Sequence, residues 1–241
     1  GCERCRCHGQ ERQPAILYTL LSQELRPRRQ CPCRQRRAVC LRTPQLTCRA
    51  ASHVLLKTIS FVKNVAAFRL LPREDQLLLL DSCWVPLFLA APAGEPGPEG
   101  MLKKILLSGQ SKGQEPEGTQ PTLAAVQRLQ RCLNSFWRLD LSPSEFTYLR
   151  GAILFNPDIP GLRAALYIES LQREAQRALR ELPHPEHRER FPHILRLAAS
   201  LGSVPAALVT ALFFRPVIGD AAMGELLAEM LFEVPGWPRA P

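Results

Sequence analysis

Few residues of this chain combine types and spacings that could support catalysis. His184, Glu186 and His187 place two imidazoles beside a carboxylate, a set that could exchange protons, but they stand among prolines in an expected exposed linker. No HExxH, GxSxG or P-loop sequence occurs, and the glycines between residues 94 and 100 are separated by Pro and Glu. We therefore predict that the protein is not an enzyme and that it binds no cofactor.

The cysteines suggest metal chemistry, but their spacing argues against it. Cys2, Cys5, Cys7 and His8 could supply four zinc ligands, yet the Cys5–Cys7 spacing is too tight for a regular structural site, so we predict no metal site. An odd number of cysteines without a secretion signal indicates reduced thiols inside the cell. Seven of the nine lie near the N-terminus: Cys2, Cys5, Cys7, Cys31, Cys33, Cys40 and Cys48.

Charge separates a basic head from a nearly neutral body. Residues 1–50 hold eleven Arg and three Glu, which leaves 20 basic and 19 acidic residues for the rest of the chain. A body with nearly equal numbers of basic and acidic residues lacks the charge distribution of a nucleic-acid-binding domain, so no direct DNA binding is expected. Arg26–Arg29 and Arg34–Arg37 are weak signals for nuclear import or nucleic-acid binding, and a solubilising tail is an equal alternative.

One motif in the head is suited to protein recognition. Leu17, Leu20 and Leu21 have the spacing LxxLL, which places three leucines on one face of a helix; Pro14 precedes that helix and Pro27 follows it. An amphipathic helix laid into an apolar groove is a recurring mode of recognition. We predict a docking helix, the alternative being a leucine cluster that packs on its own domain.

Helical periodicity dominates the body and predicts an all-α fold. Phe61, Val65 and Phe68 recur at helical spacing, and Pro72 begins a second helix whose first turn carries Glu74 and Asp75. That second helix, through Leu77–Trp84, is apolar enough to be buried on all sides. The longest apolar run, 83–92, is too short to span a bilayer, so no membrane association is expected.

Further helices are predicted toward the C-terminus, between expected loops at 91–100 and 110–121. One follows Pro121, and another begins with a capping box at Ser142 and Glu145. A long helix over residues 190–213 should kink or break at Pro205, and a short one spans 222–232. A helix after Pro160-Gly161 should direct one apolar face inward: Leu162, Leu166, Leu171, Ala175 and Leu179.

The spacing of these residues resembles the signature of nuclear-receptor ligand-binding domains. The signature residues are Phe61, Lys63, Phe68, Asp75, Gln76, Leu79 and Leu80. Later segments match the same family in order: 153–162, 168–176, 190–201 and 212–220. The resemblance implies a layered helical sandwich at residues 49–232, between a basic Cys/Arg-rich head at 1–48 and a tail at 233–241. The cysteines do not match the two zinc sites of a receptor DNA-binding domain.

The resemblance also implies two kinds of helix docking. Lys63 and Glu229 match the pair that caps the two ends of a helix bound in the family's groove, although ordinary surface charges are the alternative. The variant motif LxxIL inside the body would dock into partner receptors, unless its apolar residues face the core: Leu102, Ile105 and Leu106. The expected groove residues are Lys63, Gln76, Leu226, Leu227, Glu229 and Met230.

A hormone pocket is not expected, because residues 91–100 are too short for the family's β-turn and residues 22–47 do not resemble its first helix. Core side chains should fill the cavity instead: Cys83, Trp84, Phe88, Leu129, Cys132 and Leu208. The resemblance implies a corepressor in the nucleus, with the cytoplasm left open. It would bind agonist-bound nuclear receptors and repressive cofactors, as a homodimer or heterodimer. The alternatives are a ligand-sensing receptor and a zinc- or nucleic-acid-binding head on a helical body.

Overall fold

The structure, a computed structural model, describes residues 44–91, 121–182, 187–219 and 221–232, and every regular element within them is a helix. The sequence motifs at Leu17 and Leu102 and the N-terminal cysteines up to Cys40 lie outside the described residues. The helices are α2 (Pro44–Asn64), α3 (Ala66–Arg69), α4 (Arg73–Leu89), α6 (Leu123–Trp137), α7 (Pro143–Leu154), α8 (Ala165–Glu181), α9 (His187–Gly202), α10 (Ala206–Phe213), α11 (Arg215–Ile218) and α12 (Met223–Phe232).

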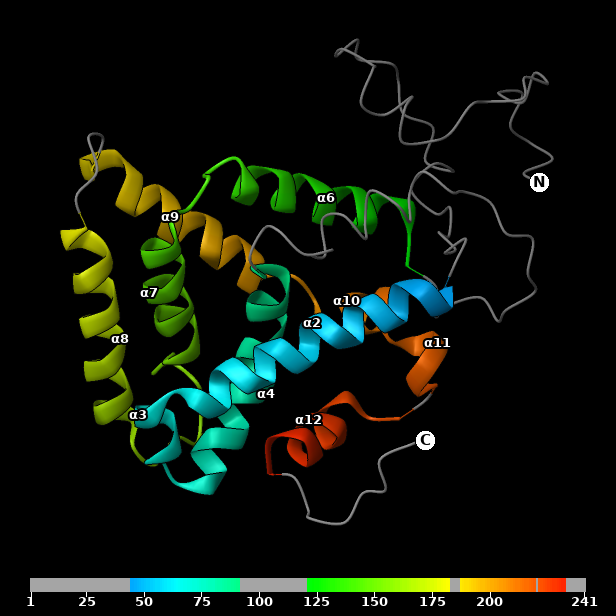
Figure 1. The fold of residues 1–241 in the computed structure, drawn as a ribbon, viewed down its shortest axis with the longest axis horizontal. Helices are drawn as coiled ribbons and strands as arrows, with labels where there is room; N and C mark the ends of the chain where they lie inside the picture. Colours follow the sequence, from blue (N-terminus) through cyan, green and yellow to red (C-terminus); the bar gives the residue numbers. More distant parts are fainter. Residues whose placement is uncertain (1–43, 92–120, 183–186, 220, 233–241) are drawn as a thin grey trace, which may run out of the picture.

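The helices pack in layers around α4, as Figure 1 shows. The long helix α2 crosses the molecule and contacts α4, α10, α11 and α12, while α7 and α8 lie side by side and α6 packs against α9. Helix α4 also contacts α7 and α9, so it is enclosed by several neighbours. Helix α2 begins at Pro44, a few residues ahead of the boundary expected at residue 48. An all-α, layered arrangement is thus confirmed.

The centre of the core is aromatic. The Trp84 ring lies edge-on to Phe214 with centroids 6.1 Å apart, and Phe88 lies 5.4 Å from both Phe213 and Phe214. Four of the side chains expected to fill the family's cavity are buried here, namely Cys83, Trp84, Phe88 and Leu129, and Cys132 and Leu208 are half-buried. Tilted and edge-on aromatic pairs stabilise a core beyond the area that they bury.

Local sequence rules place several helix ends. Pro72 is the N-cap of α4, with Glu74 and Asp75 in the first turn. Ser142 and Glu145 form the predicted capping box, each side chain bonded to the other's backbone amide. Pro205 divides the predicted 190–213 helix into α9 and α10, which are bent by 70°. No single helix within the described ranges is long and apolar enough to cross a membrane.

Two predictions about helix faces are wrong. Leu166 is 83% exposed, because α8 begins only at Ala165 and its buried face is set by Ile168 and Leu179. Leu166 lies about 200° around the helix from Ile168 and therefore faces outward. Helix α4 is not buried on all sides, since Asp81 and Ser82 are exposed. The apolar run ends at Leu80, and the polar residues that face solvent follow it directly.

Candidate helix-accepting groove

Lys63 contacts the last helix of the chain. It lies in the final turn of α2, and its Nζ donates a hydrogen bond of 3.1 Å to the carbonyl oxygen of Met230. Met230 lies in the last turn of α12, where carbonyl groups have no partner within the helix and carry the negative end of its dipole. Lys63 therefore caps the C-terminal end of α12, which is the role that the family resemblance gives it toward a bound helix.

The apolar face of α12 points into the protein. Leu227 is 2% exposed and Leu231 is 6% exposed, while Leu226 and Met230 are half-buried. Glu229 lies on the opposite side and is exposed. Residues at positions i, i+3 and i+4 share one face of a helix, so Leu227, Met230 and Leu231 form a single apolar stripe. This is the same spacing as in LxxLL, with Met in the second position.

Helix α12 lies along the first half of α4, which it contacts. At the C-terminal end of α12, the Arg73 guanidinium carbon lies 3.9 Å from the centroid of the Phe232 ring, a cation–π contact. At the N-terminal end, a Cβ placed on Gly224 would lie 3.5 Å from Oδ1 of Asp81. Lys63, Arg73 and Asp81 thus mark the face of α2 and α4 that α12 covers.

Residues of the signature hold α4 in the position that forms this face. Gln76 Nε2 donates to the carbonyl of Leu71 at 2.9 Å, which ties α4 to the turn that precedes it. The buried carboxylate of Asp75 accepts from the backbone amides of Arg163 and Ala164 at 2.9 and 2.8 Å. Asp75 thereby satisfies amides at the start of α8, in addition to lying in the first turn of its own helix.

The ring of Phe61, an aromatic residue of the signature, makes a cation–π contact with Arg150. The guanidinium carbon of Arg150, on α7, lies 3.8 Å from the centroid of the Phe61 ring and 5.6 Å from that of Phe146. The Arg150 Nε is buried without a hydrogen-bond partner. Burial lowers the pKa of Arg150 to about 10. The guanidinium remains charged at neutral pH and joins α7 to α2.

The buried carboxylate of Glu145, on α7, forms an ion pair with Arg190 on α9. Arg190 Nε donates to Glu145 Oε1 at 2.6 Å, and its Nη2 donates to Glu145 Oε2 at 3.0 Å and to the Leu139 carbonyl at 2.9 Å. The hydrogen bond from Arg190 holds the pKa of Glu145 at about 2, against the opposing effect of burial. Because both carboxylate oxygens are bonded, this ion pair has the bidentate geometry of the stronger pairs.

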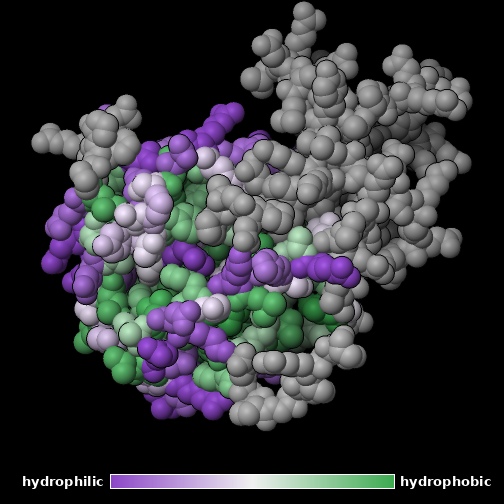
Figure 2. All heavy atoms as spheres, viewed as in Figure 1, coloured by the Kyte–Doolittle hydropathy of each residue, from purple (hydrophilic) through white to green (hydrophobic). Residues whose placement is uncertain are grey.

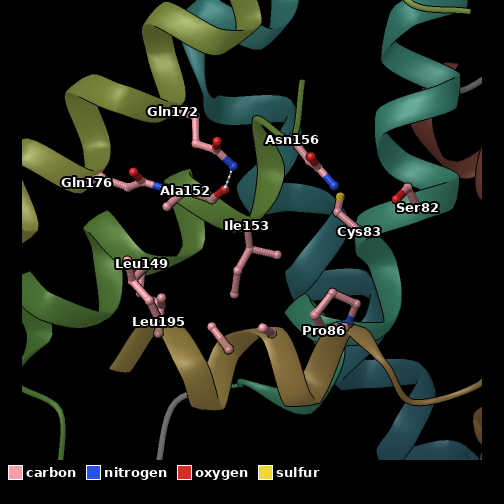
Figure 3. A pocket seen from close by; sticks show the side chains of 13 residues that line it. Ser82, Cys83, Pro86, Leu149, Ala152, Ile153, Asn156, Gln172, Gln176 and Leu195 are labelled. Atoms are coloured by element: carbon pink, nitrogen blue, oxygen red, sulfur yellow. Dashed lines mark hydrogen bonds between the residues drawn. The ribbon is translucent and has the colours of Figure 1, made fainter. Parts of the chain in front are cut away.

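A separate pocket of about 320 Å³ lies between α4, α7, α8 and α9 (Figure 3). Leu149, Ile153 and Leu195 supply apolar walls, and Gln172 donates to the Ala152 carbonyl at its rim. The Cys83 thiol lies on one wall, and burial raises its pKa, so it is not a reactive thiolate at neutral pH. Among the described residues that line the pocket, none belongs to α2 or α12.

The structure thus brings together only part of the predicted site. Lys63 meets Met230, Leu227 packs inward, and Gln76 supports the turn before α4, whereas the pairing of Lys63 with Glu229 around a bound helix stays a prediction. Arg73, Asp81 and Phe232 were missed. The sequence pattern gave little indication of these contacts, because no local rule connects residues about 150 positions apart.

Within the described ranges, no group of three or more His, Cys, Asp or Glu side chains could hold a metal ion.

Comparisons with known proteins identify the class to which this fold belongs. Residues 41–204 match the ligand-binding domain of nuclear hormone receptors. The ultraspiracle ligand-binding domain from Drosophila melanogaster superposes with a TM-score of 0.58 at 24% identity, covering 80% of this chain and 82% of that one, which supports the fold. This chain therefore belongs to the nuclear hormone receptor ligand-binding-domain family, whose members regulate transcription in the nucleus.

Relatives at higher identity place the chain within that family. It is 48% identical over 246 residues to human nuclear receptor subfamily 0 group B member 2, an alignment that covers 94% of this chain and 96% of the human protein. It is 37% identical over 227 residues to nuclear receptor subfamily 0 group B member 1 of Callithrix jacchus, covering 83% of this chain and 48% of that protein.

Proposed function

We propose that this protein is a transcriptional corepressor that binds other nuclear receptors through LxxLL-type helices. Leu17, Leu20 and Leu21 form the main docking helix, and Leu102, Ile105 and Leu106 form a second one. By occupying the groove of an agonist-bound receptor, the docking helix excludes coactivators, and the body then recruits repressive cofactors. The observation that carries the proposal is the LxxLL spacing at Leu17 in a chain of this receptor family.

The contacts of α12 support the proposed mode of helix binding. Leu227 and Leu231 are buried at the spacing of the first and last leucines of LxxLL, and a lysine caps the carbonyl end of their helix. A receptor groove of the same fold can offer Leu17, Leu20 and Leu21 the same two contacts, apolar burial and a capping cation.

The face on view in Figure 2 has hydrophilic and apolar side chains interspersed, without one continuous polar surface. Together with the balance of 20 basic and 19 acidic residues beyond residue 50, this supports contacts with proteins rather than with DNA. Action in the nucleus, with partner receptors supplying the DNA contact, is part of the proposal.

The test is binding of the full chain to an agonist-loaded nuclear-receptor ligand-binding domain. Leu20→Ala/Leu21→Ala should weaken binding by at least about tenfold, since apolar anchors dominate such interfaces. Tyr18→Ala/Thr19→Ala, which alters the residues between the motif leucines, is the matched control and should bind like the wild type. Equal binding by the two double variants would move the interface away from this motif.

A further inference from the structure

We propose that the pocket between α4, α7, α8 and α9 binds a small neutral heterocycle of two rings, whose hydrogen-bonding edge pairs with the carboxamide of Gln176. The pocket is separate from the centre of the core, where Trp84 and Phe88 pack against Phe214, and no described residue of α2 or α12 lines it. The inference does not depend on whether Leu17 docks into other receptors.

The volume of the pocket sets the size of its ligand. At about 320 Å³, it lies at the lower end of the range of natural ligand pockets. An apolar cavity of roughly 150 Å³ accommodates benzene, so this pocket has room for about two rings. Its lining includes the buried Cys83, Pro86 and Ala198 as well as the exposed Ser82 and Gly202, so a ligand can enter from solvent and reach a buried wall.

The apolar and amide side chains of the pocket lie on different sides of it. In Figure 3, Ile153, Leu195 and Pro86 lie in the lower part of the view. The carboxamides of Gln172 and Gln176, both on α8, lie above them. This arrangement fits a flat molecule that has an apolar body and one polar edge.

The charge of the lining favours a neutral ligand. None of the described residues that line the pocket is Asp, Glu, Lys, Arg or His. The Cys83 thiol is neutral as well, because burial raises its pKa. An ion that entered the pocket would lose its hydration without gaining an opposite charge, which is costly.

The carboxamide of Gln176 is the polar group that is available to a ligand. Gln172 Nε2 already donates to the Ala152 carbonyl at 3.0 Å, and Asn156 Oδ1 accepts from the Asp158 amide at 3.0 Å. Gln176 is half-buried, and within the part of the chain that the structure describes it forms no hydrogen bond through its side chain. Its NH₂ and carbonyl groups match a ring amide, which offers an N–H beside a carbonyl and can form two parallel hydrogen bonds.

The experiment measures binding of carbostyril to the full chain by isothermal titration calorimetry. Carbostyril is a neutral lactam of two fused rings, so it has the expected size, charge and polar edge. N-methylcarbostyril keeps the rings and the carbonyl but lacks the N–H, and it should bind about tenfold more weakly. Quinaldate, a carboxylate on the same kind of ring system, should also bind at least about tenfold more weakly than carbostyril, because its charge finds no partner.

Gly202→Phe tests the position of the site. A Cβ at Gly202 would meet no atom within 4 Å, so the larger side chain has space at the pocket without displacing its neighbours. It should weaken carbostyril binding by about tenfold or more, because its ring takes space that the ligand needs. Ser203→Phe is the matched control: it places the same ring on the next residue, which is exposed and does not line the pocket, and it should bind like the wild type.

Gln176→Leu keeps the test decisive if Gly202→Phe fails to fold. This change keeps the approximate size of a half-buried side chain and removes its amide. The preference for carbostyril over N-methylcarbostyril should fall from about tenfold to about onefold, because the N–H no longer has an acceptor. A merely structural effect would weaken both probes alike and leave their ratio unchanged.

Four results would overturn the proposal. One is the absence of carbostyril binding to the wild type at millimolar concentration, and another is equal affinity of the wild type and folded Gly202→Phe. An unchanged ratio between the two lactams in Gln176→Leu would show that this carboxamide does not contact the ligand. Quinaldate that binds as tightly as carbostyril would show that the pocket does not select neutral molecules.

Discussion

The polar contacts that join α4, α7, α8 and α9 differ in kind from those that hold α12. Glu145 and Arg190 are paired through both carboxylate oxygens, and Asp75 is fully buried with both oxygens bonded to backbone amides. At α12, Lys63 donates a hydrogen bond to Met230 and Arg73 makes a cation–π contact with Phe232, while the carboxylates of Glu225 and Glu229 face solvent.

The difference in burial predicts that α12 separates from the body more readily than α7, α8 and α9 separate from α4. A buried charge that loses its partner keeps the full cost of desolvation, so the scaffold contacts open only when the whole fold opens. A hydrogen bond that is partly exposed to solvent costs less to break, because water replaces the lost partner. The comparison predicts a fold that is stable throughout except at its last helix.

The largest expected effect comes from breaking the scaffold. Glu145→Gln removes the carboxylate charge that Arg190 contacts through two nitrogens, and the free energy of unfolding in urea should fall by about 3 kcal/mol. Glu169→Gln, which breaks an exposed i,i+4 pair with Arg173, is the matched control and should cost about 0.5 kcal/mol or less. Equal losses would remove the distinction between buried and exposed pairs.

Acid should produce a similar loss at the same contact. The folded-state pKa of Glu145 is about 2, below its ordinary value of 4.5, so its stabilisation is complete above pH 4.5 and disappears as the pH falls toward 2. The amount is about 3 kcal/mol, at 1.36 kcal/mol for each unit of pKa difference.

The check on this second prediction uses the same variant. The difference in unfolding free energy between wild type and Glu145→Gln should be large at pH 5.0 and should shrink as the pH approaches 2, because the protonated wild-type side chain resembles the amide. A difference that stays constant over this pH range would mean that another group controls the acid transition.

The sequence predicted those features that depend on neighbours along the chain. The capping box at Ser142, the start of a helix at Pro72 and the break at Pro205 each follow from the conformational limits of a few consecutive residues. The inward face of α8 could not be predicted in the same way. Its starting residue depends on Asp75, which is 88 positions from Arg163 and holds the amides there.

The candidate site was likewise predicted only in part. The signature identified Lys63, and the apolar pattern placed α12 at the C-terminus, but nothing local pairs Lys63 with Met230, 167 positions away. The roles of Arg73 and Asp81 along α12 likewise depend on how α4 and α12 pack. Contacts between distant helices are set by the whole core, which no single window of sequence contains.

The most direct test of the contrast between scaffold and α12 is amide hydrogen exchange by residue in the wild type and in Lys63→Ala. The wild type should exchange much faster at 223–232 than in α4 and α7. Lys63→Ala should lower the opening free energy of α12 by about 1 kcal/mol, or about fivefold in rate, with α4 and α7 unchanged. If α12 is as protected as α4 in the wild type, or if Lys63→Ala leaves its exchange unchanged, the account of a detachable last helix is wrong.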